Sequence, residues 1–244
     1  MSQFHSIRLI LGDQLNPQHS WYREKDDGIL YLMAELHQEA VYVKHHIQKL
    51  CGFFAAMADF AQSLKAEGHQ LCYYSLDESA QFDSLSQMIS SLCQLHNVSF
   101  FDYQAPDEYR LSQQMLALDL GPDIKICCYD SEHFLLPKDE IGQYINSGVH
   151  NRMESFYRKM RKRFYVLMEG DQPRGDRWNF DGENRQKLKA ADLAEVPEPL
   201  LFSNDVSAIL ERLERHKIAS IGKGTEQLLW PVNQQQALQL LEFF

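Results

Sequence analysis

The run Gly28-Ile-Leu-Tyr-Leu-Met-Ala34 decides the fold class of this chain. Its six consecutive apolar residues are too few for a core helix and too uniform for a strand with one solvated face. Such a run is typical of a strand that is buried on both faces of a parallel sheet. Four comparable runs occur at Ser6–Gly12, Leu71–Ser75, Val98–Asp102 and Ile124–Cys128, so we expect a five-stranded parallel sheet.

Helical patterns separate these runs. From Ala40 to Glu67, apolar residues recur every three or four positions, and the pattern ends at Gly68. Further helices are expected over Ala80–Leu95 and Glu108–Leu118. Strands that alternate with helices indicate a doubly wound α/β fold with helices on both faces of the sheet. In such folds, ligands bind beyond the carboxyl ends of the strands, where the strand order reverses.

The strand signals end near Phe134, and the chain becomes helical and punctuated. Met153–Met168 has the pattern of a basic helix, and Glu169–Arg185 is a polar loop rich in glycine and aspartate. We therefore predict an α/β domain over residues 1–133, a helical linker region over 134–203 and the start of a helical domain over 204–244.

Composition and charge narrow the class of protein. The 244 residues are 44% hydrophobic and 24% charged, which is ordinary for a globular chain. No run of 18 uncharged apolar residues occurs, and the start lacks a signal-peptide pattern, so we expect a cytoplasmic protein without a membrane partner. The net charge of −10 disfavours general coating of nucleic acid. The charge is unevenly distributed along the chain. Arg152–Arg163 holds six basic residues and one acid, so this segment carries a charge of +5 and the other residues together carry −15.

Polar side chains follow the first two strands at the expected ligand edge. Gly12, Asp13 and Gln14 come directly after the first strand, where glycine permits close approach and the other two can bond polar groups. A turn that merely ends the strand is the alternative. Glu39 and Tyr42 follow the second strand, one helical turn apart. This cluster suits a polar organic ligand.

Metal and nucleophile chemistry find little support in the sequence. The adjacent His45 and His46 would point in different directions on a helix, and the H-E-x-x-H motif is absent. Neither a phosphate loop nor a G-x-S-x-G elbow occurs. We predict no metal and no catalytic residue here, and we rank an independent nucleotide-using α/β enzyme last. The five cysteines lack a C-x-x-C pair and indicate reduced core residues: Cys51, Cys72, Cys93, Cys127 and Cys128.

The segment Arg174-Gly-Asp-Arg-Trp-Asn-Phe-Asp-Gly-Glu-Asn-Arg185 is too polar for a core. Aromatic and arginine side chains beside a basic helix are what stacking on unpaired bases would use. The alternative is a loop that packs one aromatic ring and holds itself together with ion pairs. A non-catalytic module that binds nucleic acid or another partner is therefore a second hypothesis.

Four segments together resemble the iron–sulfur bacterial cryptochromes and (6-4) photolyases, a photolyase-related family. They are Arg8–Leu15, Glu39–His46, Met153–Arg161 and Met168–Arg185, and the last is long and specific. The resemblance implies a Rossmann-like or flavodoxin-like antenna domain, an interdomain linker and the first residues of a helical domain. The abrupt end after Phe244 favours a fragment of such a longer chain, which leaves open whether this chain is itself an enzyme.

The resemblance also implies a pigment, 6,7-dimethyl-8-ribityllumazine, that passes light energy to FAD. By position, the pigment pocket would be lined by Gly12, Asp13, Gln14, Glu39 and Tyr42. Phe53 stands where the family often has a smaller aliphatic residue, so its ring would either stack on the lumazine or fill its site. A ribityl chain needs polar partners and a flat ring needs apolar walls, which agrees with this set.

The rest of the family's machinery would lie outside this chain. The resemblance implies that FAD and a 4Fe-4S cluster would belong to the C-terminal helical domain of a full-length protein that acts in light-driven DNA repair. Without that domain, an exposed apolar face would favour a homodimer. The resemblance puts the linker loop near the DNA lesion, with Asp181 and Arg185 as the lesion-side residues. The basic helix, with Lys159, Arg161 and Lys162, would then supply phosphate contacts.

Overall fold

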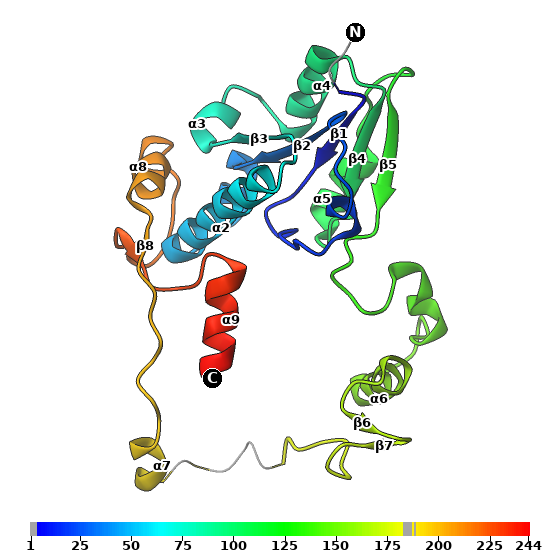
Figure 1. Cartoon of the computed structure of the whole chain (residues 1–244), viewed down its shortest axis with the longest axis vertical. Coiled ribbons are helices and arrows are strands. Elements are labelled where there is room, and N and C mark those ends of the chain that lie inside the picture. Colours follow the sequence, from blue (N-terminus) through cyan, green and yellow to red (C-terminus); the bar gives the residue numbers. More distant parts are fainter. Residues whose placement is uncertain (1–3, 183–186, 188) are drawn as a thin grey trace. The chain divides into compact units, whose positions relative to one another are not determined.

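Five parallel strands form one sheet in the order β3-β2-β1-β4-β5 (Figure 1). The computed structural model describes residues 4–182, 187 and 189–244. β1 lies at the centre, with Leu9 opposite Leu32 on one side and Tyr103 on the other. This order confirms the predicted doubly wound, Rossmann-like sheet. The strands are β1 (Ser6–Leu9), β2 (Ile29–Ala34), β3 (Leu71–Tyr74), β4 (Phe100–Gln104) and β5 (Lys125–Tyr129).

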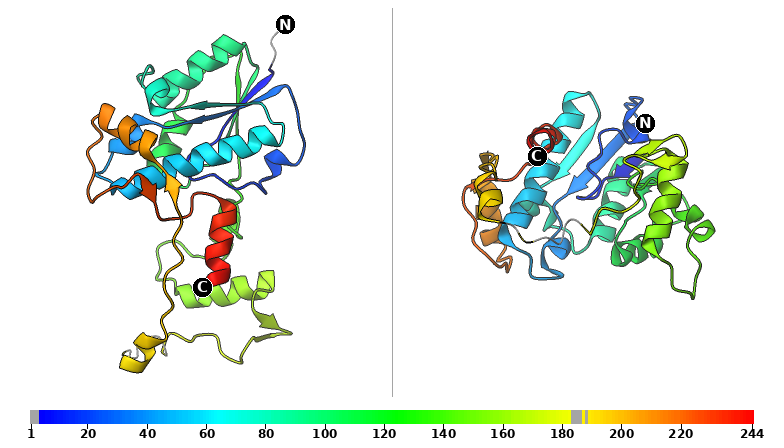
Figure 2. Two further views of the ribbon diagram at one scale, coloured as in Figure 1. Left: turned by 60° about the vertical axis from the view of Figure 1, so that its left-hand side comes forward. Right: turned by 90° about the horizontal axis from the view of Figure 1, so that it is seen from below.

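Helices cover both faces of the sheet, as the alternating pattern predicts. α2 (Ile47–Ala66) and α8 (Ser207–Arg215) pack on one face. α4 (Leu85–His96) and α5 (Tyr109–Leu116) pack on the other, so α2 and α4 lie on opposite sides of the strands (Figure 2). Shorter helices connect them: η1 (Ser20–Tyr22), α1 (His37–Val41) and α3 (Leu76–Ser79).

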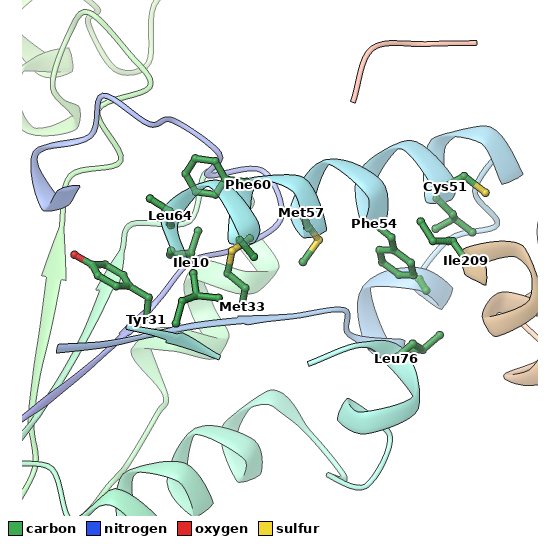
Figure 3. Packing of buried hydrophobic residues seen from close by; sticks show 14 of the residues in the cluster. Ile10, Tyr31, Met33, Cys51, Phe54, Met57, Phe60, Leu64, Leu76 and Ile209 are labelled. Atoms are coloured by element: carbon green, nitrogen blue, oxygen red, sulfur yellow. The ribbon is translucent and has the colours of Figure 1, made fainter. Parts of the chain in front are cut away.

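The larger hydrophobic cluster lies between the sheet and α2 (Figure 3). Ile10 and Met33 reach up from the strands toward Met57, and Ile209 of α8 packs beside Cys51 at the other end of α2. All five side chains are buried. Burying each side chain of this size stabilises the fold by about 1.5–3 kcal/mol, so the cluster fixes α2 against the strands.

The predicted helix over Ala40–Glu67 is interrupted near its start. Ala40 and Val41 end α1, residues 42–44 form a turn, and α2 begins at Ile47. His46 caps α2, because its imidazole Nδ1 accepts a hydrogen bond from the backbone N–H of Gln48 at 3.2 Å. Backbone hydrogen bonds between this stretch and Ile221 also replace helical ones. A contact distant in sequence therefore overrides the local apolar period.

The chain divides into two compact units, Met1–Ser131 with Leu200–Phe244 and Glu132–Pro199. The C-terminal segment thus packs with the α/β unit, and its role as the start of a helical domain stays a prediction. It contains the short pair β8 (Asn204–Asp205) and β9 (Gln227–Leu228), with α8 between them and α9 (Gln234–Phe243) after them. Among the described residues, no helix combines the length and the apolar character needed to cross a bilayer.

A buried ion pair joins α8 to the sheet. Arg212 donates two hydrogen bonds to the carboxylate of Glu35, at 2.9 and 2.8 Å. The hydroxyl of Tyr73 and the backbone N–H of Leu76 also donate to this carboxylate, each at 2.8 Å. The Glu35 side chain is 0% exposed and that of Arg212 is 16% exposed. The carboxylate is therefore fully satisfied inside the protein.

The second unit contains the predicted basic helix, α6 (Met153–Phe164). It ends four residues earlier than predicted, because Tyr165 adopts a left-handed conformation with φ 54°. A short hairpin of β6 (Met168–Glu169) and β7 (Gln172–Pro173) follows. Within the residues of this unit that the structure describes, η2 (Lys138–Gln143) and α7 (Ala190–Ala194) are also helical.

Candidate functional site

A cavity of about 270 Å³ lies where β1 and β2 end, against α2. Its interior is apolar and its rim is polar. The position agrees with the rule that ligands bind beyond the carboxyl ends of parallel strands near the reversal of strand order. Apolar lining residues include Ile10, Leu11, Ala34, Leu36, Leu50, Phe54, Met57, Leu85 and Leu111, and polar ones are Asp13, Glu39, Tyr42, His45, Lys49 and Glu108.

The turn after β1 divides its three predicted site residues. Gly12 and Asp13 line the cavity, and a Cβ at Gly12 would lie 2.9 Å from the sulfur of Met57. Glycine at this position therefore permits the close approach of α2. Gln14 lies outside the lining, because its buried amide accepts from the N–H of Leu11 and donates to the carbonyl of Gln104. Gln14 thus joins β1 to β4.

Glu39 and Tyr42 come together on the rim, and Arg110 links them. The Arg110 Nη2 donates to Glu39 Oε2 at 2.7 Å, and its guanidinium carbon lies 4.6 Å from the centre of the Tyr42 ring. The hydrogen bond to Glu39 raises the pKa of Arg110. Gln38 donates to the other oxygen of Glu39 at 2.9 Å. The Glu39 carboxylate is therefore held in place on both oxygens.

Arg110 is the important residue that the candidate set misses. It follows β4, whose carboxyl end meets those of β1 and β2 at one edge, so the same positional rule covers it. Glu108, two residues earlier, lines the cavity and caps α5. Partial burial acts to raise the pKa of Glu108, but hydrogen bonds from the N–H groups of Leu111 and Arg110 outweigh it and lower that pKa. The Glu39 and Glu108 carboxylates on the rim are thus both held by N–H donors.

His45 belongs to the cavity, whereas His46 does not line it. The His45 Nε2 donates to the carbonyl oxygen of Glu39 at 3.2 Å, and its ring packs edge-on against Tyr42 with 5.0 Å between centroids. Lys49 donates to His45 Nδ1 at 3.4 Å. These roles correspond to the tautomer with its proton on Nε2. His46 therefore caps α2, and His45 forms part of the cavity wall.

Phe53 lines the cavity at its mouth. Its side chain is 42% exposed, and the ammonium of Lys49 lies 5.6 Å from the centre of its ring. The ring therefore forms part of the wall of the cavity and leaves its volume of about 270 Å³ open. Within the described residues, no group of three or more His, Cys, Asp or Glu side chains gathers as a metal site.

The predicted nucleic-acid residues lie in the second unit, and they divide into separate places. Arg161 donates to the carbonyls of Val166 and Leu167, so it closes the end of α6. The cationic groups of Arg161 and Lys162 lie 5.1 and 5.6 Å from the centre of the Trp178 ring. The loop that carries Trp178, called the aromatic loop below, thus packs against the basic helix α6.

Lys159 and Asp181, two further residues of the predicted nucleic-acid set, are exposed on the surface of this unit. Lys159 lines a hollow of about 300 Å³ with Arg152 and His150. Asp181 is exposed in the loop after Trp178, and Arg185 lies outside the described residues. Of the predicted residues that the structure describes, Lys159, Arg161 and Lys162 therefore lie on α6, and Asp181 lies in the loop that follows.

A sequence model of deoxyribodipyrimidine photo-lyase-related proteins matches residues 8–229. The chain belongs to this family. A (6-4) photolyase from Agrobacterium fabrum is 31% identical over 219 residues, which are 88% of this chain and 43% of that protein. Uncharacterized protein R852 of Acanthamoeba polyphaga mimivirus is 27% identical over 151 residues, 60% of this chain and 74% of that protein. The resemblance is thereby confirmed.

The photolyase-related match extends over the sheet, the basic helix, the aromatic loop and α8. The cavity and its rim therefore lie wholly within the matched region. The chain spans less than half the length of the (6-4) photolyase that it matches.

Proposed function

We propose that the α/β unit binds 6,7-dimethyl-8-ribityllumazine and serves as the antenna domain of a photolyase/cryptochrome-like protein. The observation that carries this proposal is the cavity beyond β1 and β2, which combines an apolar interior with a rim of fixed carboxylates. When bound, the pigment would absorb light and pass excitation to FAD in a C-terminal domain of the full-length protein. That domain would also hold the 4Fe-4S cluster and supply the chemistry of light-driven DNA repair.

The residues present fit such a pigment. A flat heteroaromatic ring is stabilised by apolar and aromatic walls, which Phe54 and Met57 provide inside and Phe53 at the mouth. A ribityl chain carries several hydroxyl donors, and Asp13 and Glu39 offer carboxylate acceptors on the rim. Excitation transfer requires no acid–base group, so these residues need only bind and orient the ligand.

A titration tests pigment binding. We expect the purified chain to red-shift the absorbance of the lumazine and to quench its emission. Glu39→Gln should weaken binding roughly tenfold, since a charged hydrogen-bond acceptor becomes neutral. Glu67→Gln, at the far end of α2, is the matched control and should bind as wild type. A correctly folded chain that fails to bind at high micromolar concentration would refute the proposal.

A riboflavin titration separates two ligand classes. Riboflavin carries the same ribityl chain as the lumazine, but on a three-ring system. Equal affinity for both compounds would show that the cavity selects the ribityl group rather than the lumazine ring. In that case the antenna assignment would lose its main support.

We propose further that α6 contacts DNA phosphates in the full-length protein. The observation in favour is the exposed +5 segment Arg152–Arg163, in a chain of net charge −10. Lys159 and Lys162 are suitable probes because both are exposed and neither closes the helix end as Arg161 does. Lesion-side roles for Asp181 and Arg185 remain part of this proposal.

The DNA proposal is tested by salt dependence. Lys159→Ala with Lys162→Ala should weaken binding to lesion or single-stranded DNA and reduce the slope of log K against log salt by about 1.5–2. Lys138→Ala with Lys223→Ala removes the same charge from residues outside the α6 segment and should keep the wild-type slope. An unchanged slope in the first variant would exclude phosphate contact by Lys159 and Lys162. DNA binding without pigment binding would favour the non-catalytic nucleic-acid module instead.

A further inference from the structure

The loop after α8 supports the turn that forms one wall of the cavity. The N–H of Ile221 donates to the carbonyl of His45, and the N–H of Ile47 donates to the carbonyl of Ile221, each at 2.9 Å. These two bonds form a parallel bridge between His46 and Ile221. The two partners are far apart in sequence, so the turn before α2 depends on a segment that follows α8.

Gly222 brings this loop close to His46. Its φ is +79°, a conformation that glycine adopts without strain, and a Cβ there would overlap the imidazole of His46, with Cε1 only 2.6 Å away. The imidazole cannot move away freely, because its Nδ1 accepts the hydrogen bond that caps α2. The absence of a side chain at position 222 therefore keeps His46 in its capping position.

The opposite side of this turn faces the cavity. His45 lies next to the bridge and lines the cavity, where it contacts Glu39 and Tyr42. Lys49 follows in the first turn of α2 and donates to His45. A displacement of the turn would therefore move the polar wall formed by His45 and Lys49.

We propose that Ile221 and Gly222 are positioning residues of the ligand site, although they lie outside the cavity lining. They hold the turn at residues 45–47 from behind, so the cavity keeps its shape only while the segment after α8 is docked. The identity of the ligand in this inference rests on the proposed pigment binding. The positioning role itself rests on the bridge and on the close approach of Gly222 to His46.

Gly222→Ala tests the inference in the full chain, with Gly121→Ala as the matched control. Gly121 has a similar φ of +83°, but a Cβ there would meet nothing within 4 Å. Both variants therefore carry the same backbone strain, and only one disturbs His46. We expect hydrogen exchange in ligand-free protein to accelerate over residues 40–50 in Gly222→Ala only. Lumazine affinity should fall roughly three- to tenfold in that variant.

A second-site change identifies the contact responsible. His46→Ser removes the ring and keeps an oxygen that can cap α2. The double variant Gly222→Ala with His46→Ser should exchange and bind lumazine within about twofold of His46→Ser alone. Wild-type exchange in Gly222→Ala, equal effects in Gly121→Ala, or no rescue in the double variant would each overturn the inference. If wild type fails to bind lumazine, the pigment proposal is wrong, and the exchange measurements still decide the positioning role.

Discussion

Replacing Arg212 by methionine should strongly destabilise the α/β unit. The change keeps most of the apolar side-chain length and removes both hydrogen bonds to Glu35. The Glu35 carboxylate has no exposed surface, so it would keep its charge away from water without its cationic partner. Breaking such a buried pair costs about 3–5 kcal/mol.

The remaining donors place the expected cost near the lower limit. Tyr73 and the N–H of Leu76 still donate to Glu35 in the variant, and hydrogen bonds to a charged group contribute about 1.5–3 kcal/mol each. We therefore expect Arg212→Met to lose about 3 kcal/mol. Adding Glu35→Gln removes the unpaired charge and keeps an acceptor, so the double variant should recover to within about 1–2 kcal/mol of wild type.

Urea unfolding followed by far-UV circular dichroism measures these differences in the free energy of unfolding. The four proteins, wild type, two single variants and the double, form a double-mutant cycle that isolates the pair. Arg215→Met removes a neighbouring arginine whose partner Asp77 is on the surface, and it should change stability little. A loss below about 1 kcal/mol for Arg212→Met would mean that α8 is not docked through a buried pair.

Three further outcomes follow from the structure. Hydrogen bonds from Arg215 first, and then from a neighbouring histidine, lower the pKa of Asp77 to about 2. The stability that this carboxylate contributes is present above its unfolded pKa near 3.8 and is lost as the pH falls toward 2. Because Arg215→Gln removes the main cause of the lowered pKa, NMR titration of this variant should show a higher midpoint for Asp77. Burial raises the pKa of Cys93 to about 12, so a thiol reagent at pH 8 should label the exposed Cys128 first, and prompt labelling of Cys93 would contradict the fold. Phe101→Ala should lower the unfolding free energy by about 3–5 kcal/mol, because that ring is fully buried between the sheet and α4. A smaller loss would indicate that neighbouring side chains move in to fill the space left by the ring.

The sheet was predictable because its information is local. Each of the five strands is a short apolar run between helical patterns, and buried strands such as Ile29–Ala34 have no polar residue to obscure the signal. The limits of the helices were less predictable. The apolar period continues through residues 42–46, where the helix is interrupted, since nothing in the local pattern encodes the bridge to Ile221.

The candidate site was predictable in part for the same reason. Gly12 and Asp13 follow β1, and Glu39 and Tyr42 lie in and after the short helix that follows β2, so the strand-end rule brings them to one edge. Gln14 has the same sequence position, but its amide satisfies backbone groups of Leu11 and β4, which only the folded chain reveals. Arg110 was missed because its importance comes from a salt bridge across 71 positions of sequence.

The α/β unit is discontinuous in sequence, because residues 132–199 form a separate unit that is inserted between Ser131 and Leu200. Both ends of that insert are attached to the same body, so its basic helix is tethered at both ends rather than carried on a free arm. A protease that cuts within the insert would therefore leave two fragments held together without a covalent bond. Their association would depend on Arg212 and Glu35, which makes fragment complementation a natural property of this architecture.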